Sequence, residues 1–209
     1  MQLYSYFRSS ASYRVRIALA LKDVSYQTIA IHLAKGKHTE SPFISVNPQA
    51  RVPVLKLDSG DLLIQSLAII DWLDETHPQP PLLPSDPIAR ARVRAVSQII
   101  ASDVHPLGNL GPRNYLLKKL NLDLETVDAW TRHWIKDGFA AVEKMIAPAP
   151  YSFGALPTLA DICLIPQVFN ARRYKVDMAK FPKIVAVDEA CQKHPAFAAA
   201  APSAQPDAE

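Results

Sequence analysis

The sequence predicts an α/β domain followed by an all-α domain. Three observations support this prediction. Residues 3–64 alternate short β-rich runs with a run of helical period, residues 78–87 contain five prolines, and beyond them the apolar residues recur at helical spacing. The 209 residues, 49% hydrophobic and 21% charged, have the composition of a globular protein and allow one large domain or two small ones.

The first elements form a βαβ unit. Residues 3–7 are a short apolar strand, residues 12–22 place their apolar side chains on one helical face, and residues 26–31 are β-rich. This order favours a parallel strand pair with a right-handed crossover.

A ββα unit follows. Residues 52–57 and 61–64 have the composition of two strands joined by a tight turn, and residues 65–77 form a helix with one apolar face. Pro53 stands where a strand starts, or where a cis bond permits a close approach.

We expect the first domain at residues 1–80, a proline-rich linker at residues 81–88 and a helical domain at residues 89–209. Its helices are expected at residues 89–110, with a kink near Pro106 and Gly108, and at residues 124–146, 158–173 and 182–193. From Ala196 onward the chain is rich in alanine and proline, which predicts a partly ordered tail.

Charge and composition exclude several classes of partner. The formal net charge is only +3 and the arginines are scattered along the chain, so we expect no nucleic-acid partner but a local pocket for a small anion. No apolar run is long enough to span a membrane and no secretory signal pattern is visible, which predicts a cytoplasmic protein. Cys163 and Cys191 lack metal-ligand spacing, so no metal is expected.

The most informative segment is the one that joins the first strand to the first helix. Ser9, Ser10 and Ser12 lie around the helix N-terminus, where free N–H groups and the helix dipole stabilise negative charge. The charge could belong to a phosphate, a carboxylate or a thiolate. The serines could also do no more than cap the helix.

Several motifs, taken in this order, resemble those of cytosolic glutathione transferases. The motifs are Val52-Pro53 before a strand, Gln65-Ser66 at a helix start and the capping-box sequence Thr158-Leu159-Ala160-Asp161. Residues 8–19, 65–70, 81–84 and 166–174 closely resemble the zeta-class signature. The resemblance implies a thioredoxin-like N-terminal domain (βαβ-ββα) and a helical C-terminal domain.

The resemblance also implies an activity. Zeta-class members include glutathione-dependent isomerases that convert maleylacetoacetate, or in close relatives maleylpyruvate, to the fumaryl isomer in the catabolism of aromatic rings and aromatic amino acids. Glutathione would be the cofactor, a small diacid the substrate and a homodimer the assembly. Two alternatives are a transferase or dehalogenase acting on small electrophiles or α-haloacids, and a non-catalytic glutathione-binding module.

The resemblance assigns the catalytic roles to residues near the sulfur and the substrate. Ser9 would donate a hydrogen bond to the sulfur, assisted by Ser10, while Arg8 and Arg173 would bind the carboxylates of the substrate. Arg113 and Arg172 are further candidates. Each arginine could instead be a solvated charge or one half of an ion pair.

The resemblance assigns glutathione binding to Ser9, His38, Val52, Gln65, Ser66, His105 and Asn109. His38 would meet the glycyl carboxylate, although it could be an exposed loop histidine, and Val52 would pair its backbone with the cysteinyl unit. His105 and Asn109 lie four residues apart and are expected on one helical face, although they could be no more than a polar stripe beside the kink. Two positions depart from the family pattern, since Ala11 stands where the zeta signature usually has cysteine and Ala155 where aspartate is common.

Overall fold

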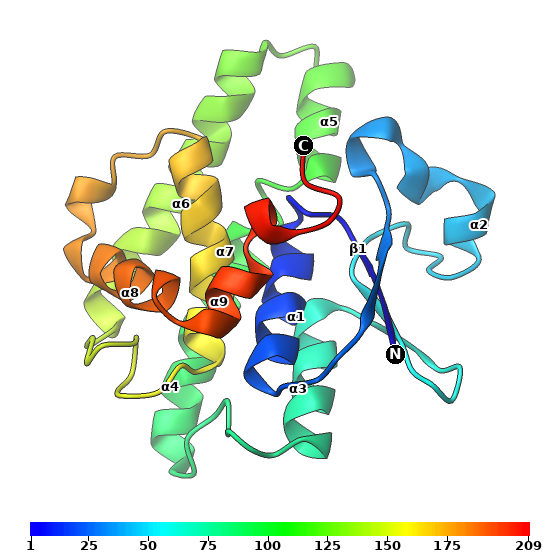
Figure 1. Ribbon diagram of the computed structural model, residues 1–209. Helices are drawn as coiled ribbons and strands as arrows, with labels where there is room; N and C mark the ends of the chain where they lie inside the picture. Colours follow the sequence, from blue (N-terminus) through cyan, green and yellow to red (C-terminus); the bar gives the residue numbers. More distant parts are fainter. The chain divides into compact units, whose positions relative to one another are not determined.

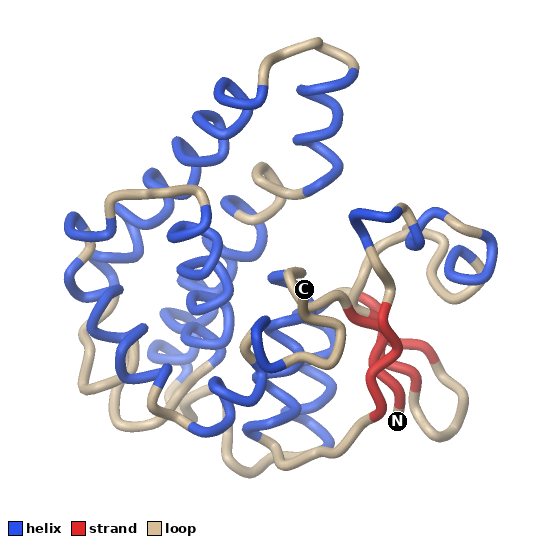
Figure 2. The backbone as a smooth tube through the Cα atoms, turned by 45° about the horizontal axis from the view of Figure 1, so that its top comes forward, coloured by secondary structure: helices blue, strands red, loops and turns tan.

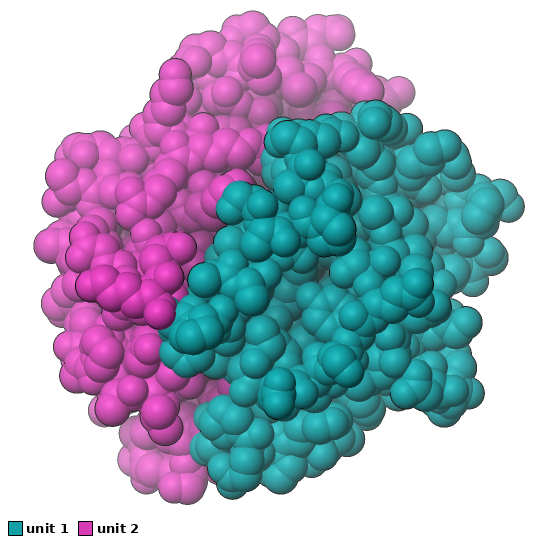
Figure 3. All heavy atoms as spheres, viewed as in Figure 1, with its two compact units in different colours: residues 1–81, 194–209 teal, residues 82–193 magenta.

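The computed structural model describes residues 1–209 as two compact units. The first unit comprises residues 1–81 and 194–209, and the second comprises residues 82–193 (Figure 3). These units differ from the expected domains, because the last 16 residues group with the first unit and not with the other helices. No helix in the chain combines the length and the apolar character that crossing a membrane requires.

The first unit is built on a four-stranded mixed sheet (Figure 2). Its strands are β1 (Gln2–Ser5), β2 (Gln27–Ala30), β3 (Val54–Lys56) and β4 (Leu62–Ile64), in the spatial order β2-β1-β3-β4. Strand β1 runs parallel to β2 and antiparallel to β3, and β3 runs antiparallel to β4. Helices α1 (Ser10–Leu21) and α3 (Ser66–Thr76) pack against each other.

The register brings four chain junctions to one end of this sheet. Tyr4 of β1 pairs with Val54, the first residue of β3, and Val54 pairs with Ile64, the last residue of β4. Ser5 pairs with Ala30, the last residue of β2. The segments that follow β1, β2 and β4, and the segment that precedes β3, therefore emerge at the same end.

An aromatic cluster supports this end of the sheet. Tyr6, Phe7, Phe43, Val52 and Val54 are buried together. Beyond β2 the chain forms η1 (Leu33–Lys35), η2 (Lys37–Thr39) and α2 (Ser41–Ile44), which supplies Phe43. Burial of these rings holds the short loops in place.

The expected partly ordered tail is wrong. Residues 195–204 form α9 (Pro195–Ala200) and η5 (Pro202–Ala204), and Phe197 is fully buried. The guanidinium of Arg16 is also fully buried and donates to the carbonyls of Ala200 (2.9 Å) and Phe7 (3.0 Å). Desolvation lowers the pKa of Arg16 to about 10, so the group stays charged at neutral pH. Figure 1 shows α9 (red) alongside α1 (blue).

The second unit is helical throughout. Its elements are α4 (Pro87–Gln98), the π-helix η3 (Ile99–Val104), α5 (Leu110–Lys118), α6 (Leu124–Met145), α7 (Leu159–Arg173), η4 (Met178–Lys180) and α8 (Pro182–Gln192). Helix α7 forms the core, since most of its residues are buried, Pro166 included. The single helix expected at residues 89–110 is wrong, because the α-helix changes to a π-helix at Ile99 and ends before Pro106.

Candidate active site

The N-terminus of α1 lies directly after the end of β1. Ser9 is its N-cap, and the Ser9 Oγ accepts a hydrogen bond from the Ser12 N–H (3.2 Å). The first turn of α1 contains no acidic residue. Because capping uses only an acceptor lone pair of Ser9, its hydroxyl proton can still be donated to a ligand. Capping and ligand binding are therefore compatible roles for this serine.

Two further serines of this turn are buried. Ser10, the first residue of α1, is 5% exposed, and Ser12 is fully buried. The Ser12 Oγ has no hydrogen-bond partner in the protein. A buried hydroxyl without a partner is costly, so this turn retains unused hydrogen-bonding capacity.

The start of α3 has an uncommon backbone conformation. Gln65 precedes the helix with φ +70°, in a region that residues other than glycine rarely adopt. Such strain is concentrated at functional sites, where the surrounding structure enforces it. Ser66 opens the helix and its Oγ accepts a hydrogen bond from the Arg14 Nη1 (3.1 Å).

Arg14 is a candidate site residue that the sequence analysis did not name. Its side chain lies in the interior of the first unit, 2% exposed, and carries a positive charge to the N-terminus of α3. The contact spans 52 residues of sequence, so no local pattern could have revealed it. The only available signal was a basic residue on the helix that follows the three serines.

Val52 and His38 lie in segments that emerge at the same end of the sheet. The Val52–Pro53 bond is cis, as one of the two alternatives for Pro53 allowed, and Val52 is buried. His38 is half-buried in η2, and desolvation lowers its pKa. The Nδ1 of His38 is buried and has no hydrogen-bond partner in the protein.

The predicted cations divide into paired and unpaired ones. Arg113 contacts Asp128 (2.6 Å) and Arg172 contacts Asp188 (2.6 Å), so these arginines have structural partners. Arg173 forms no ion pair with a carboxylate; its guanidinium lies over the ring of Tyr174 at 5.0 Å.

Arg8 in the first unit also keeps most of its donors. Its guanidinium lies 4.8 Å from the centre of the Phe7 ring, and its Nε is buried without a hydrogen-bond partner. Within 4 Å its only carboxylate partner is Glu209, at 3.9 Å. Arg8 and Arg173 are thus able to bind a carboxylate from outside the protein.

The expectation that His105 and Asn109 share one helical face is wrong. His105 caps the C-terminal end of η3, whereas Asn109 is the N-cap of α5 and accepts a hydrogen bond from the Leu110 N–H (2.8 Å). Residues 105–108 form turns between the two helices. The two side chains therefore belong to different elements, and their role in glutathione binding stays a prediction.

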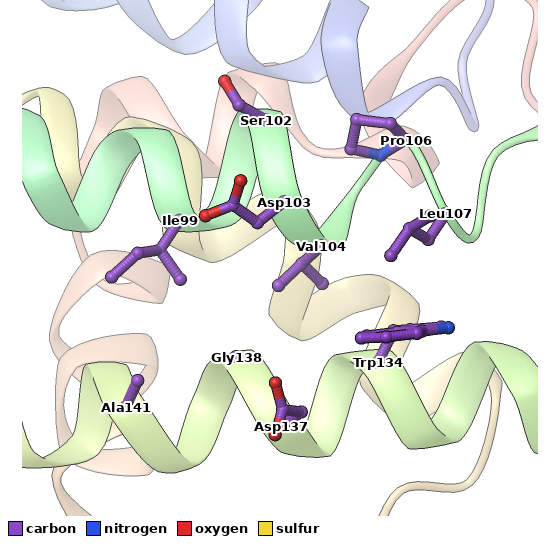
Figure 4. A pocket seen from close by; sticks show the side chains of 10 residues that line it. All are labelled: Ile99, Ser102, Asp103, Val104, Pro106, Leu107, Trp134, Asp137, Gly138 and Ala141. Atoms are coloured by element: carbon purple, nitrogen blue, oxygen red, sulfur yellow. The ribbon is translucent and has the colours of Figure 1, made fainter.

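A cavity of 470 Å³ lies in the second unit (Figure 4). Its lining comes from η3, the turn after it and α6, and comprises Ile99, Ser102, Asp103, Val104, Pro106, Leu107, Trp134, Asp137, Gly138 and Ala141. None of the predicted site residues lines it. At Gly138 a Cβ atom would lie 2.1 Å from the Val104 Cγ2, so glycine is required for the close approach of α6 to η3.

Known families match both parts of the chain. The glutathione S-transferase N-terminal domain matches residues 3–81, and the glutathione S-transferase C-terminal domain matches residues 125–199. The chain is 47% identical over 209 residues to a maleylacetoacetate isomerase of Pseudomonas aeruginosa, covering 99% of this chain and 98% of the relative. It is 49% identical over 212 residues to a maleylpyruvate isomerase of a Ralstonia species, covering 99% of each.

A solved structure is similar over the whole chain. It is the holo structure of a maleylpyruvate isomerase described as a bacterial zeta-class glutathione S-transferase, with a TM-score of 0.97, 47% identity and full coverage of both chains. The protein therefore belongs to the glutathione S-transferase family, with a thioredoxin-like first domain and a helical second one. Within that family its place is the zeta class, beside the maleylacetoacetate and maleylpyruvate isomerases.

Proposed function

We propose that the protein is a glutathione-dependent cis–trans isomerase that converts a maleyl diacid, maleylacetoacetate or maleylpyruvate, to its fumaryl isomer. The observation that carries the proposal is the N-terminus of α1, where Ser9 keeps a free hydroxyl proton and no acidic residue competes for the helix dipole. The names of the full-length relatives support the choice of reaction.

Glutathione fits the residues of the first unit. Ser66 at the start of α3, with the charge of Arg14 behind it, suits the γ-glutamyl carboxylate, and the unpartnered Nδ1 of His38 suits the glycyl end. Val52 would pair its backbone with the peptide in the manner of an added strand. When bound, glutathione supplies a thiolate that adds reversibly to the conjugated double bond, so that the bond becomes single and can rotate.

The chain itself would supply the electrostatics of the reaction. A free thiol has a pKa of about 8.5, and a helix N-terminus lowers such values by roughly one to several units. The dipole of α1 and the Ser9 hydroxyl would therefore hold the sulfur ionised at neutral pH. Arg8 and Arg173 would neutralise the substrate carboxylates and the enolate charge that develops after addition.

We also propose a cytoplasmic homodimer and an active role for Ser10 beside Ser9. Both follow from the resemblance of residues 8–19 to the zeta-class signature and from the relatives named above. Ala11 in place of the usual cysteine is compatible with the proposal, because the reaction needs only the sulfur of glutathione.

The test is turnover of maleylpyruvate and of maleylacetoacetate, each with and without glutathione, with a fumaryl-specific hydrolase as coupling enzyme. Rapid glutathione-dependent turnover of either one is expected, and the faster one identifies the substrate. The Arg173→Ala variant should lose most of that activity and retain glutathione binding. Absence of turnover with both substrates, in protein that binds glutathione, would contradict the proposal and favour the transferase or binding-module alternatives.

A further inference from the structure

One carboxylate of the chain lies among three basic side chains of the first unit. The Glu209 side chain lies 2.8 Å from the His32 Nε2, 3.6 Å from the Lys35 Nζ and 3.9 Å from the Arg8 Nη2. His32 follows β2, Lys35 ends η1 and Arg8 follows β1, so the three come from the end of the sheet at which Ser9 lies.

His32 is held in place as a hydrogen-bond donor. Its ring packs against Tyr6 with the centroids 5.2 Å apart, and its side chain is 21% exposed. The His32 Nδ1 accepts the Lys35 backbone N–H (3.1 Å), so the ring proton is on Nε2 and points to the Glu209 Oε1. The hydrogen bond from His32 is the main reason that the pKa of Glu209 is lowered, with Lys35 adding to it.

The Arg8 side chain is held in place, but its guanidinium still has unpaired hydrogen-bond donors. It lies over the Phe7 ring, its Nε has no partner, and 3.9 Å from Glu209 is too long for a hydrogen bond. A guanidinium can bind a carboxylate with two parallel hydrogen bonds, and here it forms none with Glu209. A carboxylate that lies closer to Arg8 than Glu209 does could therefore form hydrogen bonds with Arg8 that Glu209 does not form.

Glu209 belongs to a segment of five residues, 205–209, which we call the strap. Gln205 donates to the carbonyls of Ala199 (3.0 Å) and Ala201 (2.9 Å), and Asp207 accepts the Phe7 N–H (3.1 Å). Glu209 lies beyond these anchors and its side chain is 49% exposed. The exposed Glu209 side chain can therefore turn away from the basic residues while Gln205 and Asp207 keep their hydrogen bonds.

We propose that Arg8, His32 and Lys35 form a binding site for one carboxylate of the diacid substrate, and that Glu209 occupies this site until the substrate replaces it. The inference rests on the proposed function and adds His32 and Lys35 to its substrate-binding residues. The substrate is the favoured occupant because Arg8 directly precedes Ser9, the residue proposed to bind the sulfur that adds to the substrate.

The test measures binding, with malonate as a simple diacid probe and the full-length protein saturated with glutathione. The Glu209→Gln variant removes the competing charge and should bind malonate about two- to fivefold more tightly, the range for one exposed ion pair. The Lys35→Met and His32→Phe variants should bind it more weakly by a similar or larger factor. Lys37→Met is the matched control, because the Lys37 ammonium pairs with Glu40 (2.8 Å) and not with Glu209.

Two results would overturn the inference. Malonate affinity that is the same in the wild type, Glu209→Gln and Lys35→Met would mean that no carboxylate of the diacid uses this site. Weakened glutathione binding in Lys35→Met and His32→Phe, with unchanged malonate binding, would assign the site to the glycyl carboxylate instead. Because these measurements need no turnover, they separate failure of this site from failure of the proposed isomerase activity.

Discussion

Two helix N-termini in this protein look alike in sequence and differ in what they do. Helix α7 begins after Thr158, and the carboxylate of Asp161 accepts hydrogen bonds from the Thr158 N–H (2.7 Å), the Thr158 hydroxyl (2.9 Å) and the Ser152 N–H (2.8 Å). Helix α1 begins after Ser9 and has no carboxylate in its first turn. At a helix start with its own carboxylate, the N–H groups and the helix dipole are already used within the fold. At a helix start without one, they are able to bind an anion from outside the protein.

The electrostatics of the two sites follow from this difference. Asp161 is fully buried; desolvation raises its pKa, and the hydrogen bonds from Ser152 and Thr158 oppose that shift. At α1 the dipole acts on whatever lies beyond Ser9, which itself is half-exposed.

Removal of the carboxylate at α7 should have the largest effect on stability. Asp161→Ala leaves two backbone N–H groups without their acceptor in the core, which should cost about 3 kcal/mol or more of unfolding free energy. Urea unfolding followed by circular dichroism measures the loss. Asp161→Asn, which keeps one acceptor oxygen, should recover part of it, and equal stability of the three proteins would show that α7 does not depend on its carboxylate.

Addition of a carboxylate at the start of α1 should strongly reduce activity without unfolding the protein. Ser9→Asp keeps an N-cap acceptor but places a negative charge where the thiolate would bind, so we expect isomerase activity to fall about 100-fold or more. Thiolate absorbance near neutral pH should show a raised pKa of bound glutathione. Ser9→Ala separates the two roles, since it should lose about 1 kcal/mol of stability with the cap and lose activity with the hydroxyl. Full activity of Ser9→Asp would refute the distinction between the two helix starts.

Substitution of Arg14 tests whether the start of α3, like that of α1, binds an anion from a ligand. Arg14→Met removes the donor to Ser66 and the charge behind it, so the KM for glutathione should rise about tenfold while kcat changes little. Arg14→Lys should restore part of the affinity because it retains the charge. A fall in kcat with unchanged KM would show that Arg14 acts on the chemical step instead.

The smallest effect on stability is expected at the start of α6, because the carboxylate that caps this helix is exposed. Asp123 caps α6 through the Thr126 N–H (2.8 Å), and that hydrogen bond lowers the pKa of Asp123. Because the pKa in the folded state is lower than in the unfolded state, the stabilisation is present above the ordinary aspartate pKa and is lost as the pH falls through the lowered value. Stability measured against pH should fall less steeply in acid for Asp123→Asn than for the wild type, and identical slopes would contradict this.

The fold was predictable where local pattern determines structure. The βαβ and ββα units follow from residue periodicity, and the capping box at Thr158 marks the start of α7 as predicted. Helix α5 was missed because Gly111 and Pro112 lie in its first turn. The change from α-helix to π-helix at Ile99 has no local signature, and it put His105 and Asn109 on the wrong elements.

The site was predictable only in part, for the same reason. Ser9, Gln65 and Ser66 are visible as polar residues at helix starts, and the structure places them there. Other candidate residues are recognised only by contacts with distant parts of the sequence. Arg14 contacts a residue that is 52 positions away, and His32 and Lys35 contact one that is 177 and 174 positions away, respectively. The alanine-rich composition of residues 196–201 concealed that Phe197 is fully buried and that the Ala200 carbonyl accepts a hydrogen bond from Arg16 of α1.

The bond between Arg16 and Ala200 has a consequence for the order in which the protein is made. Residues 1–81 leave the ribosome long before residues 194–209, which complete the same compact unit. Until then the Arg16 guanidinium lacks one of its backbone acceptors, and the loop after β1 lacks the Asp207 that binds the Phe7 N–H. Residues 1–81 therefore reach their final form only after residues 194–209 have been translated, and the same delay applies to the site that residues 1–81 carry.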